Sequence, residues 1–170
     1  VGRKGDNLYT CSLIAVDVRD GKMKWFYQTS VHDTHDWDSA QTPVLIDATV
    51  NGRPRKLVST AARNGYFYTV DRVTGEPIWP IEEVAVPQGT VPGEWYSPTQ
   101  PIPSLRYGHQ GVAVDDLIDF TPELRAEAQS IVSKHQIGPI YTPAVPFNPN
   151  GPISTRKILG EELSLMITGK

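Results

Sequence analysis

The sequence predicts an all-β fold: part of a β-propeller, amounting to about one to two antiparallel four-stranded blades, followed by a proline-rich insertion with a short α-helix. Three observations predict it. A hairpin motif occurs twice at a fixed spacing, further strand-like runs lie between the copies, and the proline content rises after the second copy. We therefore divide the chain into a blade segment at 1–79, an insertion at 80–152 and an unassigned tail at 153–170.

The repeated motif is Val-Asp-x-x-x-Gly-x-x-x-Trp, which begins at Val16 and again at Val70, 54 residues later. A period of this length suits one propeller blade. In each copy a strand-like run precedes a turn whose glycine, Gly21 or Gly75, can take the positive φ angle that such turns require. The tryptophan then lies on the return strand, where it can dock against the neighbouring blade. Two unrelated hairpins are the alternative, and four matched positions in one register argue against it.

Two more strands are predicted at residues 42–46 and 55–60, which are rich in β-branched and aliphatic residues. They are joined through Asn51-Gly52, a dipeptide favoured in tight hairpin turns. Residues 8–79 are therefore expected to form a nearly continuous antiparallel sheet.

The insertion begins with seven prolines between residues 77 and 103. Because proline cannot donate to a sheet ladder, we expect a long excursion there and not another blade. Further on, Thr121-Pro122 has the form of an N-cap followed by proline at the first helical position. We expect a helix at about 122–135, ended by the Gly-Pro pair at 138.

The composition excludes several classes of protein. With 39% hydrophobic and 21% charged residues, the chain lies in the globular range. A net charge of -3 without a basic face gives no support to nucleic-acid binding. No apolar run approaches the roughly 20 residues that span a bilayer. The single cysteine, Cys11, excludes an internal disulfide and a cysteine-based zinc site, and the lack of an initiator methionine leads us to expect upstream sequence.

Residues 32–38 hold three carboxylates and two imidazoles. Like charges at this density cost stability unless a cation or proton compensates them. In an extended segment Asp36 and Asp38 would point to the same side, and two oxygen donors suit a hard cation such as Ca²⁺. Two alternatives stay open: a solvated acidic loop, which composition alone favours, and a His/Asp zinc site, which lacks a third spaced ligand.

The stretch His-Asp-x-x-Asp-x-Asp at 32–38 resembles the motif that carries the catalytic aspartate in pyrroloquinoline-quinone (PQQ) dependent alcohol and glucose dehydrogenases. It follows Gly-Asp-Asn at 5–7 and the first tryptophan repeat at the family's distance. The segment Arg-Asn-Gly-Tyr-Phe-Tyr at 63–68 is similar to the family's next blade. The insertion is similar to that of the membrane-bound glucose/quinate branch and of soluble relatives that share this loop. His35 departs from the pattern, because many relatives carry tryptophan there. The resemblance covers roughly residues 5 to 150 and identifies the chain as a fragment of the eight-bladed propeller.

The resemblance implies specific roles. Asp36 would be the general base and, with Asp38, a metal ligand. Arg63 and Asn64 would bind the cofactor PQQ, with the guanidinium on the quinone oxygens. The metal would be Ca²⁺, or a lanthanide or Mg²⁺, and would polarise the PQQ carbonyl as a Lewis acid.

The implied function is oxidation of an alcohol or aldose sugar in the periplasm, with a quinone or cytochrome as electron acceptor. Any membrane association would lie in regions outside the chain, and the isolated chain is expected to be inactive. A non-catalytic propeller scaffold for protein binding is the alternative, and Asp36 with Arg63 discriminates, because a scaffold needs neither. A calcium-binding structural module ranks last.

Overall fold

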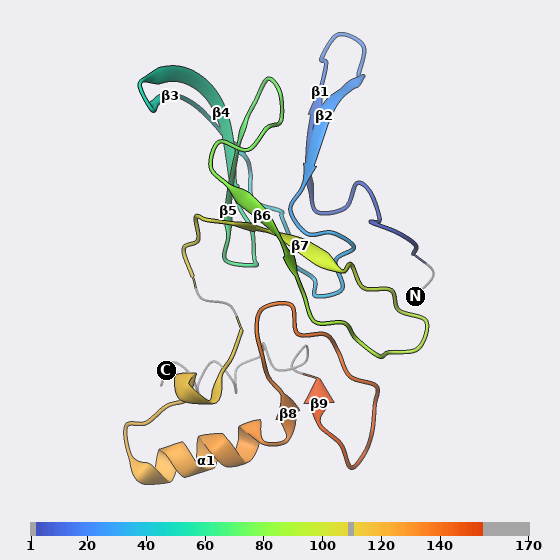
Figure 1. Ribbon diagram of the computed structural model, residues 1–170, viewed down its shortest axis with the longest axis vertical. Coiled ribbons are helices and arrows are strands. Elements are labelled where there is room, and N and C mark those ends of the chain that lie inside the picture. Colours follow the sequence, from blue (N-terminus) through green and yellow to red (C-terminus); the bar gives the residue numbers. More distant parts are fainter. Residues whose placement is uncertain (1–2, 109–110, 155–170) are drawn as a thin grey trace. The chain divides into compact units, whose positions relative to one another are not determined.

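The computed structural model describes residues 3–108 and 111–154 (Figure 1). These form two compact units, one made of residues 3–86 and 97–108 and the other of residues 87–96 and 111–154. The first unit holds β1 (Ser12–Val16), β2 (Met23–Gln28), β3 (Val44–Val50), β4 (Arg53–Ala61), β5 (Phe67–Asp71), β6 (Ile81–Ala85) and β7 (Thr99–Pro103). The second holds the 3-10 helix η1 (Val114–Asp116), α1 (Pro122–Val132), β8 (His135–Gln136) and β9 (Ile153–Ser154). Small antiparallel sheets with one α-helix confirm the predicted all-β class.

All four strands predicted from strand-like composition form, but in two sheets and not in one nearly continuous sheet. β1 pairs with β2, and β3, β4 and β5 make a separate three-stranded sheet in that order. The expectation of continuity was wrong because residues 29–43 leave the sheet as an irregular loop. The turn between β3 and β4 is as predicted, with Asn51 at φ 50° and Gly52 at φ 74°.

The two copies of the repeat have the same turn. Gly21 donates its backbone N–H to Asp17, and Gly75 donates to Asp71, with both bonds at 2.8 Å. Each aspartate in turn donates its own N–H to the carbonyl five residues on, again at 2.8 Å in both copies. The glycines lie at φ 70° and 81°, the left-handed region that glycine takes without a steric cost. The sequence repeat is therefore a repeat of conformation.

Trp25 confirms the docking prediction. Its indole Nε1 donates to the backbone carbonyl of Arg72 in the second copy at 3.2 Å. Its ring covers Gly75 so closely that a Cβ atom there would lie 2.8 Å from the ring. The same side chain packs against the buried cluster of Leu13, Val58 and Val70. One tryptophan thus joins the β1–β2 hairpin to the β3–β5 sheet.

The return segment of the second copy is shorter than predicted. Pro77 makes only an isolated bridge with Val70, and Ile78 donates to Thr69 at 3.0 Å. Trp79 follows this bridge with 37% of its surface exposed. The second copy therefore has an isolated bridge where the first copy has the strand β2.

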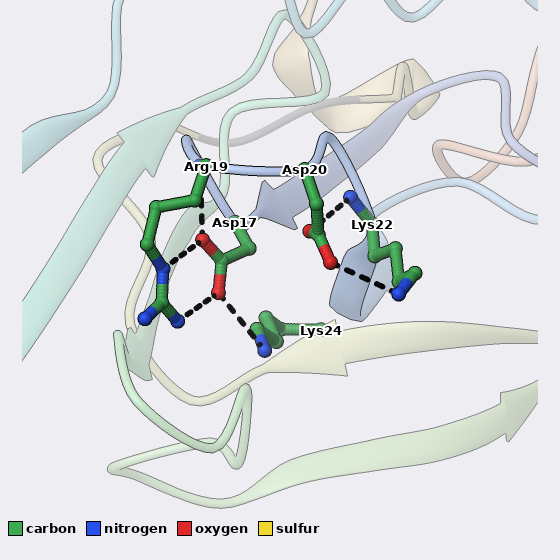
Figure 2. A network of polar contacts seen from close by, with 5 residues as sticks. All are labelled: Asp17, Arg19, Asp20, Lys22 and Lys24. Atoms are coloured by element: carbon green, nitrogen blue, oxygen red, sulfur yellow. Dashed lines mark hydrogen bonds and ion pairs between the residues drawn. The ribbon is translucent and has the colours of Figure 1, made fainter.

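A charged network holds the turn between β1 and β2 (Figure 2). The Asp17 carboxylate accepts from Arg19 at 2.7 Å and pairs with Lys24 at 3.1 Å, while Asp20 pairs with Lys22 at 3.0 Å. Hydrogen bonds from Arg19, then from Lys24, hold the pKa of Asp17 well below its usual range. Because these bases are largely exposed, the ion pairs add little to stability. Each charge is matched within the turn, which we interpret as local structure.

The proline-rich stretch, expected to be an excursion and not another blade, contains the two-stranded β6–β7 hairpin, which was not predicted. β6 and β7 pair antiparallel over their full length, although β7 contains Pro101 and Pro103. The donor at this end of β7 is Ser104, which bonds to Pro80 at 3.2 Å. Backbone N–H groups alternate along a strand, so the nitrogens of residues 101 and 103 face away from β6. Prolines at alternate positions are compatible with one paired edge.

The helix of the second unit begins where predicted. Thr121 Oγ1 accepts the Leu124 N–H at 3.3 Å, and proline occupies the first turn. The helix ends at Val132, earlier than predicted, and its inner face joins the cluster of Leu117, Ala128 and Val132. β8 pairs in parallel with β9 at the start of the predicted tail, and residues 155–170 of that tail lie outside the described residues. The described helices are all too short or too polar to cross a membrane.

Candidate functional site

The acidic segment lies in the loop between β2 and β3, and distant residues tie down its start. Thr29 donates its backbone N–H to Cys11 at 2.7 Å and accepts from the Tyr68 hydroxyl at 2.8 Å. On β7, the Gln100 side-chain amide accepts the Val31 N–H at 2.8 Å and donates to the Val31 carbonyl at 2.7 Å. The β6–β7 hairpin lies in the segment expected to be an excursion, and through Gln100 it holds this loop in place.

His32 is an anchor of the loop. Its side chain is buried, and its backbone lies in the left-handed region at φ 46°. The ring Nδ1 bonds to the Gly5 carbonyl, and the backbone N–H donates to Asp6 at 3.1 Å. This contact gives the Gly-Asp-Asn motif at 5–7 a structural purpose. A buried histidine is inconsistent with a fully solvated loop.

Asp33 shapes the loop around the predicted base. Its Oδ1 accepts the backbone N–H of His35 at 2.9 Å, and its Oδ2 accepts that of Trp37 at 2.8 Å. The Trp37 side chain is buried, and the His35 ring stacks on it with centroids 5.9 Å apart and an interplanar angle of 5°. Asp33 thus makes hydrogen bonds on both sides of Asp36.

Asp36, Asp38 and Arg63, three residues predicted from the sequence, come together. The Arg63 Nη1 lies 2.8 Å from Asp38 Oδ2 and 3.9 Å from Asp36 Oδ2. The Arg63 backbone N–H also donates to the Asp38 carbonyl at 3.1 Å. The hydrogen bond to Asp38 raises the pKa of Arg63, which stays charged. The Asp36 side chain is 81% exposed, so it is open to a ligand.

The backbone at this point differs from the extended segment expected. Asp36 lies at φ 62°, in the left-handed region, so simple alternation of side chains does not apply. Both carboxylates still reach the same guanidinium, because the loop turns at Asp36. A nearby arginine and not strand geometry brings the two acids to one side.

Asn64 is placed differently from Arg63. Its side chain is fully buried, with Nδ2 donating to the Tyr68 hydroxyl at 2.8 Å and Oδ1 accepting from the Tyr66 N–H at 3.2 Å. Tyr68 in turn holds Thr29 at the start of the loop. The described contacts of Asn64 therefore connect the turn after Arg63 with the start of the acidic loop, through the buried Tyr68.

The donor set fits part of a hard-cation site. Carboxylate oxygens are the ligands that Ca²⁺ prefers, and Asp36 and Asp38 offer two such groups beside one another. Across residues 3–108 and 111–154, no group of three or more His, Cys, Asp or Glu residues is arranged to hold a metal ion. Because Ca²⁺ takes six to eight oxygens and two carboxylates offer at most about four, other groups would have to complete the shell.

Cys11 packs beneath the loop as a neutral thiol. Its Sγ lies 3.7 Å from the Trp37 carbonyl and 3.9 Å from Asp33 Oδ2. Burial, followed by the charge of Asp33, raises the pKa of this thiol to about 11.

We expect Cys11 to react with iodoacetamide at pH 8 roughly 100-fold more slowly than glutathione, because only the thiolate is nucleophilic. The rate should rise as the pH approaches 11, where the thiolate forms. Mass spectrometry of the alkylated peptide over a pH series measures it. Rapid alkylation at pH 8 would contradict the buried, protonated state.

Comparison with known proteins places these residues in a family. The model of the PQQ glucose/ethanol/alcohol dehydrogenase β-propeller domain matches residues 1–161. The quinoprotein glucose dehydrogenase of Escherichia coli (strain K12) is 38% identical over 99 residues, which are 58% of this chain and 12% of that protein. The quinate/shikimate dehydrogenase (quinone) of Acinetobacter baylyi is 35% identical over 120 residues, 69% of this chain and 15% of that protein.

Among solved structures, the quinohemoprotein alcohol dehydrogenase from Comamonas testosteroni is similar, with 37% identity and a TM-score of 0.43. The match covers 58% of this chain and 14% of that structure. The chain therefore spans about one seventh or less of the length of these three proteins.

Proposed function

Because this chain belongs to the glucose/ethanol/alcohol dehydrogenase β-propeller family, we propose that it is the segment of a longer PQQ-dependent dehydrogenase that carries the general base. Its small open sheets, joined through Trp25, are a partial propeller. The observation that carries the proposal is the meeting of Asp36, Asp38 and Arg63 at one exposed edge. A scaffold would have no need of this group.

Asp36 is assigned the proton transfer. Its carboxylate is exposed and lies 3.9 Å from the Arg63 guanidinium, and a positioned carboxylate can act as a general base. It would accept the hydroxyl proton of the substrate, an alcohol or an aldose sugar, at a carboxylate oxygen. The exposure of this side chain leaves room for the substrate to approach.

Arg63, Asp36 and Asp38 would hold the cofactor and the metal. The guanidinium suits the quinone oxygens of PQQ, because it presents several donors in a fixed plane. Asp36 and Asp38 would each give oxygen ligands to Ca²⁺, or to a lanthanide or Mg²⁺. PQQ polarised by the cation would supply the hydride acceptor. For Asn64 we propose an indirect part in cofactor binding, since its buried amide fixes the turn that presents Arg63.

The same family membership supports proposals for the electron acceptor and for the location. The name of the Acinetobacter baylyi relative specifies a quinone, and the Comamonas testosteroni enzyme is a quinohemoprotein. We propose a quinone or a cytochrome as the acceptor, and the periplasm as the compartment.

The test is reconstitution of the full-length protein with PQQ and either Ca²⁺ or a lanthanide, followed by dye-linked oxidation of a panel of alcohols and aldoses. We expect turnover that depends on both PQQ and the metal. A full-length protein that binds no PQQ would exclude the proposal and favour a scaffold.

Replacing Arg63 with lysine is expected to weaken PQQ binding by roughly 10- to 100-fold, because hydrogen bonds to charged groups contribute about 1.5–3 kcal/mol and lysine cannot reproduce the planar fork. Titration of the apoprotein with PQQ, followed by recovered activity, measures the change. Arg19→Lys is the matched control, since Arg19 lies in the β1–β2 turn. Equal PQQ affinity in both variants would remove Arg63 from the cofactor site.

A further inference from the structure

We propose that Asp33 is a positioning residue for the reaction. Its carboxylate holds the backbone on both sides of Asp36 and so fixes the orientation of the proposed base. The inference rests on the proposed function of Asp36 and extends it to a residue that makes no contact with the reacting atoms.

Asp33 makes two hydrogen bonds to the backbone of the loop. The two oxygens of one carboxylate accept the backbone N–H groups of residues 35 and 37, at 2.9 and 2.8 Å. The Trp37 amide belongs to the peptide that leaves Asp36, and the His35 amide lies one peptide before the one that enters it, so Asp33 restrains the backbone on both sides of Asp36. Both contacts use different oxygens, which fixes the position of the carboxylate as well as that of the loop.

Asp36 has an unusual backbone conformation. Its φ of 62° lies in the left-handed region, which residues with a Cβ atom rarely adopt unless their surroundings hold them there. The Asp36 side chain is 81% exposed, so side-chain packing contributes little to that restraint. The bonds from Asp33 to residues 35 and 37 restrain the backbone on both sides of Asp36, beside the ion pair of the Asp36 side chain with Arg63 at 3.9 Å.

Asp33 is itself anchored by other residues. Arg3 donates to its backbone carbonyl at 3.1 Å, and the Cys11 thiol lies 3.9 Å from its Oδ2. On the far side of Asp36, the buried ring of Trp37 is covered by the His35 ring. The exposed Asp36 thus lies in the chain between the anchored carboxylate of Asp33 and the buried indole of Trp37. This arrangement preorganises a catalytic group.

The test compares Asp33→Asn with Asp6→Asn in the full-length protein loaded with PQQ and Ca²⁺. Asparagine has one acceptor oxygen where aspartate has two, so one of the two amide bonds is lost. Asp6→Asn removes the same charge close to the loop, yet keeps the backbone carbonyl through which Asp6 contacts His32. For each variant we would measure kcat, the KM for the alcohol, the PQQ content and the thermal midpoint.

We expect Asp33→Asn to lower kcat by roughly 10- to 100-fold, with KM changed less than about threefold and PQQ content unchanged, because small misplacements of a catalytic group cost rate and not cofactor affinity. Asp6→Asn should keep the wild-type kcat. A loss of activity that only follows a loss of PQQ content or of folded protein would make Asp33 structural and overturn the inference.

Wild-type kcat in Asp33→Asn would also overturn it, and Asp36→Asn separates this failure from failure of the proposed function. If Asp36→Asn is inactive while Asp33→Asn is fully active, Asp36 remains the base and Asp33 has no part in aiming it. If both variants are fully active, the assignment of Asp36 itself is wrong.

Discussion

Replacing Asp36 with asparagine is expected to lower kcat by about 10²- to 10⁴-fold, the contribution typical of a positioned general base. Asparagine is nearly the same size but cannot accept the substrate proton. Because the side chain is 81% exposed, the change should leave the fold intact. Dye-linked turnover of the full-length protein, corrected for PQQ content, measures the effect.

Asp20→Asn is the control for Asp36→Asn. Asp20 is another exposed aspartate beside a base, Lys22, but it lies in the turn between β1 and β2 (Figure 2). It should retain wild-type turnover. Unaltered turnover in Asp36→Asn at full PQQ occupancy would exclude Asp36 as the base, whether or not the variant still binds the metal.

Substitution of Gly75 by alanine is expected to lower the free energy of unfolding by about 2–5 kcal/mol. About 1–2 kcal/mol comes from the left-handed conformation, since Gly75 lies at φ 81°. A further 1–3 kcal/mol, roughly, comes from overpacking, because the new Cβ atom would lie 2.8 Å from the Trp25 ring. Urea unfolding of the full-length protein, followed by tryptophan fluorescence, measures the loss.

The matched control is Gly52→Ala in the turn between β3 and β4. Gly52 has a similar φ of 74°, but no atom lies within 4 Å of the added Cβ. It should therefore lose only the conformational part, about 1–2 kcal/mol. Equal losses at both positions would show that the contact between Trp25 and Gly75 contributes nothing to docking.

Local patterns predicted most of the secondary structure, because they depend on residues close together in the chain. The Asn51-Gly52 turn, the glycine turns of the repeat and the threonine cap of α1 were all predicted correctly. The β6–β7 hairpin was missed because proline was taken to exclude pairing. The prolines of β7 lie at alternate positions, so their nitrogens face away from β6. This depends on the register of the two strands, which the composition does not show.

Part of the candidate site was also accessible to sequence reasoning. Asp36, Asp38 and Arg63 were predicted through resemblance to a family, and the structure brings them together. Gln100 was not predicted, because it lies 69 residues from Val31 and within a segment that carried no functional motif. Asn64 was predicted to bind a cofactor, whereas its described contacts lie in the core.

The sequence by itself determined the class of fold, the repeat and the turns, since each of these follows from residue type and short spacing, and its resemblance to a family predicted the reactive residues. Only the tertiary structure decided how those residues are held. The left-handed backbone at Asp36, the two amide bonds of Asp33 and the bracing by Gln100 depend on backbone directions set by distant segments. A hydrogen bond across tens of residues requires the chain to return to one point in space, and this is a property of packing that no local pattern encodes.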